Sequence, residues 1–226
     1  MSLTSKSLKT PLRYPGGKSR ATAKLAQFFP DLNQYKEFRE PFLGGGSVAI
    51  YITKMYPDLN IRVNDLFEPL STFWKCLQDH GNEITQRLEF AKQRHPNPMS
   101  AKDLFDESKE YLELDVRERD AIQTAVNFYI VNKCSFSGLS ANSSFSKQAS
   151  DSNFSMRGIK RLPEYSELIQ NWTITNDRYQ QLLTDDKSVF TYLDPPYEIG
   201  SNLYGRKGDM HKSFDHDGFA TICDRF

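Results

Sequence analysis

The chain has 226 residues, in which 29 Lys and Arg balance 29 Asp and Glu, so the formal net charge is zero. This length supports one large domain, or one domain with a substantial insertion, and the neutral balance does not by itself indicate a nucleic-acid partner. Three scattered cysteines without a CxxC motif argue against a disulfide framework and a zinc site, and no apolar run reaches membrane-spanning length, so we expect a cytoplasmic protein without a metal.

Basic residues are concentrated in two stretches of the chain. Residues 1–30 carry six Lys and Arg and no acid, and residues 131–161 carry five against the single Asp151. Two such stretches could face one polyanion, such as a nucleic acid. The alternative is an ordinary solvated surface whose charge is balanced elsewhere.

The first part of the chain alternates predicted helices and strands. In chain order the expected elements are a helix at 21–29, a strand at 36–40, a helix at 47–55, a strand at 61–64 and a helix from about 66. Ser47 is the expected N-cap of the second helix. A strand, a glycine turn, a helix and a strand in this order indicate a parallel α/β sheet, whose ligands bind at the carboxyl ends of the strands.

The remainder contains a helical stretch and a return to strand-forming sequence. Residues 73–132 have a helical and polar pattern, broken near 95–98, and residues 134–158 are rich in Ser, Asn and Gly, which predicts an ordered, turn-rich excursion. The elements expected after it are a strand at 172–175, a helix near 178–183, a strand at 189–193 and a helix from about 215.

These elements predict an α/β fold with an insertion. The catalytic domain is expected at residues 1–72, its cofactor half, and at 166–226, its active-site half, around an insertion at 73–165. At most four strands are counted, whereas open α/β sheets usually have five or six, so we expect a C-terminally truncated chain.

Asp194-Pro195-Pro196-Tyr197 follows the last predicted strand directly. Proline stiffens the turn and removes backbone donors, which leaves the Pro195 carbonyl and the Asp194 carboxylate as two acceptors. Two acceptors that hold the protons of an amino group direct its nitrogen lone pair toward an incoming methyl group, and Tyr197 offers a flat face for a base. The alternative is a Pro-Pro turn with an Asx cap and a core tyrosine.

Residues 40–47, Glu-Pro-Phe-Leu-Gly-Gly-Gly-Ser, lie between a predicted strand and a helix. Glycines there let a ligand approach the backbone, and the helix N-terminus offers unpaired amides, although a tight turn is the alternative. Asp65, at a strand end, is placed to accept hydrogen bonds from ribose hydroxyls. Asn176-Asp177 could accept from the amino group of a cofactor adenine or could N-cap the next helix.

Residues 13–19 end in Gly17-Lys18-Ser19, which imitates a phosphate-binding P-loop. The P-loop pattern requires a glycine five residues before Gly17, where this chain has Leu12, and no apolar strand precedes the segment. The sequence therefore disfavours a nucleotide-hydrolysing P-loop.

With these motifs in this order, the chain resembles the D12 class, or Dam-like, adenine-N6 DNA methyltransferases. The matching elements are Tyr-x-Gly-Gly-Lys at 14–18, Pro-Phe-x-Gly-Gly-Gly-Ser at 41–47, Asn-Asp at 64–65, a loosely matching target-recognition insertion, and Asp-Pro-Pro-Tyr at 194–197. The resemblance implies a Rossmann-like, S-adenosylmethionine-dependent methyltransferase sheet with an inserted helical target-recognition domain.

The resemblance also implies residue roles. Asp194, Pro195 and Pro196 would form the catalytic turn that orients the target amine, and Tyr197 would stack on the target base. The implied cofactor-binding residues are Tyr14, Lys18, Phe42, Gly44, Gly45, Gly46, Ser47, Asp65 and Asp177.

Residues 133–139 resemble the Asn-Arg-x-x-Phe-Asn-Gly-Leu segment that opens the DNA-contacting hairpin of the family. The implied DNA-binding residues are Lys133, Ser137, Asn142 and Lys147. Dam-type members carry Asn before Gly-Leu and an arginine shortly after it, whereas this chain has Ser137, then Ala141 and Asn142. Recognition of GATC is therefore not expected, and residues 140–146 are more similar to variants in phage and restriction-modification enzymes.

The expected function is methyl transfer from S-adenosylmethionine to N6 of an adenine flipped out of double-stranded DNA, in one in-line step without a covalent intermediate. We favour a monomer. Three alternatives remain: a P-loop ATPase, a methyltransferase acting on cytosine N4 or on a protein or small-molecule amine, and a catalytically inactive DNA-binding module. Against the second, cytosine enzymes favour Ser and glutamine enzymes Asn in place of Asp194.

Overall fold

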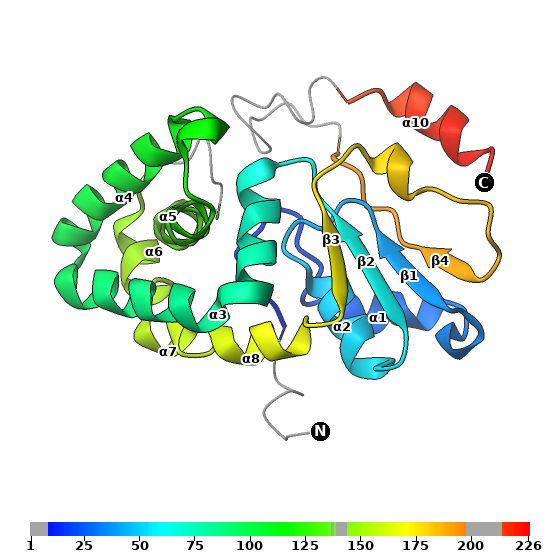
Figure 1. Ribbon diagram of the computed structural model, residues 1–226, viewed down its shortest axis with the longest axis horizontal. Helices are drawn as coiled ribbons and strands as arrows, with labels where there is room; N and C mark the ends of the chain where they lie inside the picture. Colours follow the sequence, from blue (N-terminus) through cyan, green and yellow to red (C-terminus); the bar gives the residue numbers. More distant parts are fainter. Residues whose placement is uncertain (1–8, 137, 139–143, 198–213) are drawn as a thin grey trace.

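The computed structural model describes residues 9–136, 138, 144–197 and 214–226. A parallel four-stranded sheet in the order β3-β2-β1-β4 forms its centre. The strands are β1 (Glu37–Glu40), β2 (Asn60–Asn64), β3 (Trp172–Thr175) and β4 (Val189–Thr191). Figure 1 shows this sheet to the right of a group of helices, which confirms the predicted α/β fold.

Helices connect the strands and build the insertion. The α-helices are α1 (Thr22–Leu25), α2 (Ser47–Met55), α3 (Glu68–Arg94), α4 (Pro98–Glu113), α5 (Ala121–Cys134), α6 (Lys147–Ser152), α7 (Met156–Ile159), α8 (Leu162–Leu168) and α10 (His216–Cys223). Short 3-10 turns are η2 (Ala26–Phe28), η3 (Leu32–Gln34), η4 (Val116–Glu118) and η5 (Tyr179–Leu182). Within the described residues, no helix has the length and apolar content needed to cross a bilayer.

One face of the sheet is covered by helices, as the alternation along β1 shows. Phe38 is fully buried, whereas its neighbours Glu37 and Arg39 are only partly buried, because successive side chains of a strand point to opposite faces. α2 packs against β2, and α1 packs against α2 (Figure 1). Helices therefore hold the sheet at one face, and the loops that follow the strands are free to form a site at the strand ends.

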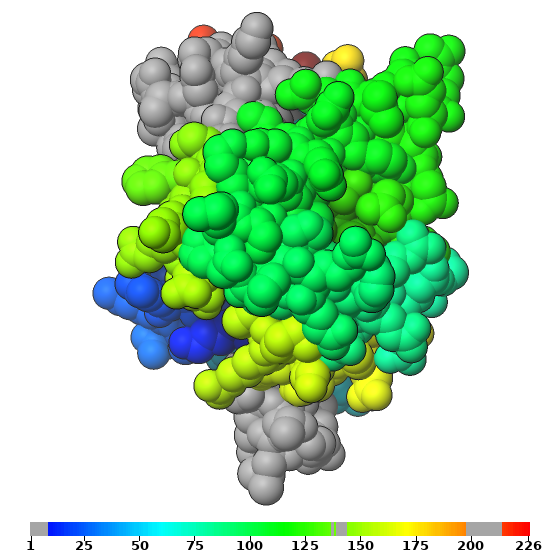
Figure 2. Space-filling view, turned by 90° about the vertical axis from the view of Figure 1, so that its left-hand side faces the viewer, coloured from blue at the N-terminus to red at the C-terminus, as the bar shows by residue number. Residues whose placement is uncertain are grey.

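The insertion and the sheet share one hydrophobic core. Trp74 of α3 lies 5.7 Å from Trp172 of β3 between ring centroids, and the neighbouring Phe73 stacks at 5.9 Å on Tyr129 of α5. Large buried aromatic rings contribute much of the packing energy of a core. The inserted helices, which form the face seen in Figure 2, are therefore held firmly against the catalytic sheet.

Helix α5 is more buried than its sequence pattern predicts. The structure buries it from Thr124 to Asn132, because it lies between α3 and α4. The prediction of a polar helical insertion is thus wrong for this helix. The predicted domain boundary at residue 72 falls within α3, which continues to Arg94 with a kink at His80, and the boundary stays a prediction.

The predicted N-cap at Ser47 is wrong. Ser47 is the first helical residue of α2, and Gly46 occupies the cap position with a left-handed φ of 67°. The capping bond comes from β1 instead: Glu40 Oε2 accepts from the Ala49 backbone N–H at 2.8 Å. The Glu40 carboxylate, from a different element, therefore accepts the hydrogen bond of a helix N-terminal amide for which the local sequence predicted Ser47 as the acceptor.

Two further local predictions need correction. Residues 147–159, expected to be turn-rich, form the short helices α6 and α7, which Ser146 and Ser155 cap through their hydroxyl oxygens. The helix expected near 178–183 is the 3-10 turn η5. The high serine content of this segment suggested a loop, but two of its serines act as helix N-caps.

Candidate active site

A cavity of about 700 Å³ lies at the carboxyl ends of the strands. The segments that line it include 14–18, 40–45, 47–48, 64–66, 178–180, 194–197 and 214–215. Because all four strands are parallel, the loops that follow them meet at this one edge of the sheet. Residues far apart in the sequence thus share one chamber.

Glycines shape the loop after β1. Gly44 and Gly46 have φ values of 49° and 67°. A Cβ atom at Gly44 would lie 2.9 Å from Cε1 of Tyr14, and one at Gly46 would lie 2.7 Å from Cζ2 of Trp74. Close packing and backbone conformation therefore both require glycine. Gly44 and Gly45 line the cavity, whereas Gly46 packs on Trp74 and does not line it.

Asp65 ties the end of β2 to this loop. Its Oδ2 accepts from the Gly44 N–H at 2.8 Å, and its Oδ1 accepts from the Phe67 N–H at 2.9 Å. Burial raises the pKa of Asp65 to about 6, against the lowering effect of these two bonds. The carboxyl group lines the cavity and is 7 % exposed, so it has a structural role beside any contact with a ligand.

Glu40 is a second buried carboxyl group at the cavity. Burial raises its pKa well above the ordinary value, although the bond from the Ala49 N–H lowers it, and nearby Asp194 raises it further. No sequence motif predicted a role for Glu40. An acid at the last position of a strand, directly before the glycine loop, is the signal that could have found it.

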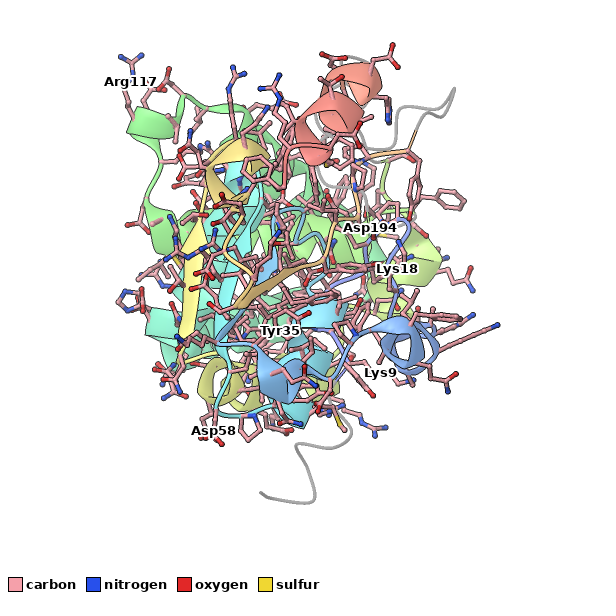
Figure 3. All side chains as sticks on the ribbon, turned by 90° about the vertical axis from the view of Figure 1, so that its right-hand side faces the viewer. Lys9, Lys18, Tyr35, Asp58, Arg117 and Asp194 are labelled. Carbon is pink, nitrogen blue, oxygen red and sulfur yellow. The ribbon has the colours of Figure 1, made fainter. Side chains whose placement is uncertain are left out.

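Lys18, Asp194 and Tyr197 form a closed cluster of hydrogen bonds. Lys18 Nζ donates to Asp194 Oδ2 and to the Tyr197 hydroxyl oxygen, both at 2.5 Å, and to the Gly16 carbonyl oxygen at 2.9 Å. The Tyr197 hydroxyl donates to Asp194 Oδ1 at 2.7 Å. Both oxygens of the Asp194 carboxylate are thus held, and Figure 3 shows Lys18 and Asp194 beside each other.

The charge of Lys18 is maintained by this cluster. Partial burial lowers the pKa of the ammonium group, but the bonds to Asp194 and Tyr197 and the charge of Asp194 outweigh it and raise the pKa above the ordinary value. Charge-assisted hydrogen bonds of this kind are short and directional. Lys18 therefore anchors Asp194 as a full cation.

Aromatic rings form another wall of the cavity. Phe42 lies 5.3 Å from Tyr179 between ring centroids, and Phe214 lies 5.9 Å from both. Of these three rings, only Phe42 belongs to a predicted motif. Tyr179 and Phe214 carry no local motif, and only the folded chain brings them to the cavity.

Asp177 is not among the residues that line the cavity. It is exposed, and its backbone N–H and carbonyl oxygen bond to the side chain of Asn64, at 2.8 and 2.9 Å. Asn64 thereby joins the ends of β2 and β3. The neighbouring Arg178 and Tyr179 face the cavity instead.

Two of the predicted DNA-binding residues, Lys133 and Lys147, are not among the residues that line the cavity. Lys133 is half-buried at the end of α5, with Nζ 5.2 Å from the ring centroid of Tyr129, and Lys147 is exposed at the start of α6. Ser137 and Asn142 lie outside the described residues. The structure thus places two of the four.

Eleven of the predicted catalytic and cofactor-binding residues line one cavity. They are Tyr14, Lys18, Phe42, Gly44, Gly45, Ser47, Asp65, Asp194, Pro195, Pro196 and Tyr197. The P-loop alternative does not fit this arrangement, because no described strand precedes Gly17 and the ammonium of Lys18 is bonded to Asp194. The cavity therefore places Asp194 and Pro195 beside the glycine loop, and its walls contain aromatic and acidic side chains.

Comparison with known proteins agrees with this geometry. A family model described as D12 class N6 adenine-specific DNA methyltransferase matches residues 14–226. The chain is also similar to three named relatives. The type II methyltransferase M.MjaIII of Methanocaldococcus jannaschii is 21% identical, in a match that covers 84% of this chain and 70% of the relative. The modification methylase StsI of Streptococcus sanguinis is 24% identical, in a match that covers 92% of this chain and 32% of the relative. The type II methyltransferase M.CviBI of Paramecium bursaria Chlorella virus NC1A is 22% identical, in a match that covers 88% of this chain and 72% of the relative.

Proposed function

The chain belongs to the D12 class N6 adenine-specific DNA methyltransferase family, and from this premise we propose that its cavity brings S-adenosylmethionine and a flipped adenine of DNA together at Asp194. The observation that carries the proposal is the position of Asp194, three residues after the end of β4. There it shares one cavity with the glycine loop and Asp65. An acceptor for the target amine thus lies in the same chamber as a site suited to the methyl donor.

The cavity fits S-adenosylmethionine in size and chemistry. About 700 Å³ is within the range of pockets that bury small ligands. The donor carries positive charge on its sulfonium and amino groups, and the carboxyl groups of Glu40 and Asp65 line the walls. The rings of Phe42 and Tyr179 suit its adenine, and the glycines allow close approach to the backbone.

We assign the cofactor contacts within this set. The residues that would surround the donor are Tyr14, Phe42, Gly44, Gly45, Ser47 and Asp65. Lys18 would lie at the border of the donor site, and Gly46 would fix the glycine loop from outside the cavity. Tyr179 replaces Asp177 in the assignment, because Tyr179 lines the cavity and Asp177 does not.

The catalytic step would depend on positioning. The donor supplies a methyl group on a positively charged sulfur. Asp194 and the Pro195 carbonyl would accept hydrogen bonds from the adenine amino group, which directs the nitrogen lone pair toward that methyl group. Pro196 stiffens the turn and Tyr197 would stack on the flipped base. The Asp194 carboxylate is also placed to take the proton that the methylated nitrogen loses.

The insertion would hold the DNA. Lys147 at the start of α6 and Lys133 at the end of α5 are cations that could contact phosphates, and we propose that Ser137 and Asn142 also contact DNA. Extruding a base costs a few kcal/mol, which stacking on Tyr197 helps to offset.

The biological setting follows from the named relatives. They are called type II methyltransferases and a modification methylase, so we propose that this enzyme protects DNA as part of a restriction-modification or phage system. We propose that it acts as a monomer.

The decisive experiment replaces Asp194 by alanine. We expect loss of N6-methyladenine formation with S-adenosylmethionine binding retained, because Asp194 holds the amine rather than the donor. Asp58→Ala, an exposed acid at the far end of the molecule from Asp194 in Figure 3, is the matched control. Full activity of the Asp194 variant would refute the assignment. Mapping N6-methyladenine in DNA from cells that express the protein would identify the target sequence.

A further inference from the structure

Asn132 joins three separate segments of the chain. It is fully buried near the end of α5. Its Oδ1 accepts from the Arg13 N–H at 3.0 Å, and its Nδ2 donates to the Arg13 carbonyl oxygen at 2.6 Å and to the Gly138 carbonyl oxygen at 2.8 Å. The amide thus pairs with the backbone of Arg13, 119 residues away, much as a neighbouring strand would.

A second set of contacts closes the same junction. Arg13 Nη1 donates to the Ser135 carbonyl oxygen at 2.7 Å. Gly138 has a φ of 76°, and a Cβ atom there would lie 2.6 Å from both Cβ and the carbonyl oxygen of Arg13. Arg13 is therefore enclosed between the end of α5 and the segment that follows it.

On one side of this junction lie two paired segments, residues 134–136 and 144–146, which we call the hairpin base. Ser135 and Phe145 form an antiparallel bridge, the Phe136 N–H donates to the Ser144 carbonyl oxygen at 3.0 Å, and the Ser146 N–H donates to the Cys134 carbonyl oxygen at 2.8 Å. This is the segment to which the proposed function assigns DNA contacts.

On the other side lies the catalytic cavity. Tyr14, the residue after Arg13, packs its ring against Gly44 and Gly45 of the glycine loop, and four residues later Lys18 bonds to Asp194. Fixing the backbone of Arg13 therefore fixes the start of the segment that reaches both the proposed cofactor site and the catalytic carboxylate.

We propose that Asn132 is a positioning residue that couples DNA binding at the hairpin to the cofactor loop and Asp194. The inference rests on the proposed function, since it assumes a DNA-contacting hairpin and a cofactor in the cavity. Motion of the hairpin base on DNA is transmitted to Arg13 by its paired backbone bonds with Asn132 and by its side-chain bond to the Ser135 carbonyl oxygen, and then by Tyr14 to the glycine loop. Such coupling is reciprocal, so DNA tightens cofactor binding by the same factor as cofactor tightens DNA binding.

The test measures that factor. S-Adenosylhomocysteine is titrated into the full chain with and without a duplex carrying the mapped target sequence, and the ratio of the two dissociation constants is the coupling factor. We expect a factor of at least about 5 for the unaltered protein, within the usual range of coupling between sites. In Asn132→Ala the factor should fall to about 1, while the affinity without DNA changes little.

Asn127→Ala is the matched control, because Asn127 is also buried in α5 but, among the described residues, its side chain bonds only within the insertion, to Ser108 and Gln123. It should keep the coupling factor. If Asn132→Ala lowers the urea midpoint but keeps the coupling factor of the unaltered protein, Asn132 has a purely structural role and the proposal is overturned.

Arg13→Met gives an independent route should Asn132→Ala not fold. It removes the bond to the Ser135 carbonyl oxygen and leaves Asn132 in place. We expect a reduced coupling factor, and an unchanged factor would overturn the proposal, as would a factor of 1 in the unaltered protein. Absence of any S-adenosylhomocysteine binding would instead refute the proposed cofactor, which separates the two failures.

Discussion

Lys18 and Asp194 stand 176 residues apart in the chain, yet Lys18 Nζ lies 2.5 Å from Asp194 Oδ2. The other oxygen of Asp194 accepts from the Tyr197 hydroxyl at 2.7 Å. The acceptor proposed for the target amine is thus oriented by donors of the protein itself. Each carboxylate oxygen keeps a second lone pair for the adenine amino group, so the N-terminal segment positions the catalytic carboxylate and leaves it able to accept from the base.

Lys18→Met should lower kcat by about 10- to 100-fold. The substitution removes the cation that anchors Asp194, and a small displacement of a catalytic group can cost two orders of magnitude. Steady-state methylation of DNA measures the effect. Lys24→Met, an exposed lysine in the same basic stretch, should have normal kcat. A Lys18→Met enzyme with normal kcat would show that the contact with Asp194 has no part in the reaction.

The parts of the site that could be predicted from the sequence are those that belong to short motifs directly after a strand. The turn at Asp194 and the glycines at 44–46 follow strands, and parallel strands bring such ends together. Glu40 and Tyr179 escaped prediction because their roles arise from contacts across the fold. Gly46 was predicted as a cofactor contact, but its packing on Trp74 of α3 also arises across the fold, so its place as the cap of α2 could not be found from the local sequence.

Gly46→Ala should destabilise the protein by about 2 to 5 kcal/mol. The left-handed φ of 67° disfavours a side chain, and the added Cβ would lie 2.7 Å from the buried Trp74 ring. The shift in urea midpoint measures the change. Gly158→Ala in α7 is the control: its Cβ would lie 3.4 Å from Ser155 Oγ, and its midpoint should stay close to that of the unaltered protein. Equal midpoints for the two variants would contradict the packing argument.

Tyr179→Ala should weaken S-adenosylmethionine binding by about 10-fold, because stacking of a base on an aromatic ring contributes about 1 to 3 kcal/mol. Isothermal titration without DNA measures the affinity. Tyr179→Phe keeps the ring beside Phe42 and should bind as the unaltered protein does. If both variants bind equally, the ring does not contact the donor.

DNA affinity should depend on pH through Lys133. Burial, together with the charge of Arg13, lowers the pKa of Lys133 to about 8. A phosphate beside this amine favours its protonated form, so at pH values above about 8 DNA binding must take up a proton. The dissociation constant for DNA is then expected to rise with pH above 8, by as much as about 10-fold per unit for one proton.

Fluorescence anisotropy with a labelled duplex, from pH 7 to 9.5 at constant salt, measures this dependence, since salt alone changes DNA affinity strongly. Lys133→Arg should remove the slope, because arginine stays protonated throughout this range. Lys147→Arg, at the exposed start of α6, should leave the slope intact. A slope that persists in Lys133→Arg would assign the proton to another group and leave Lys133 without a contact to DNA.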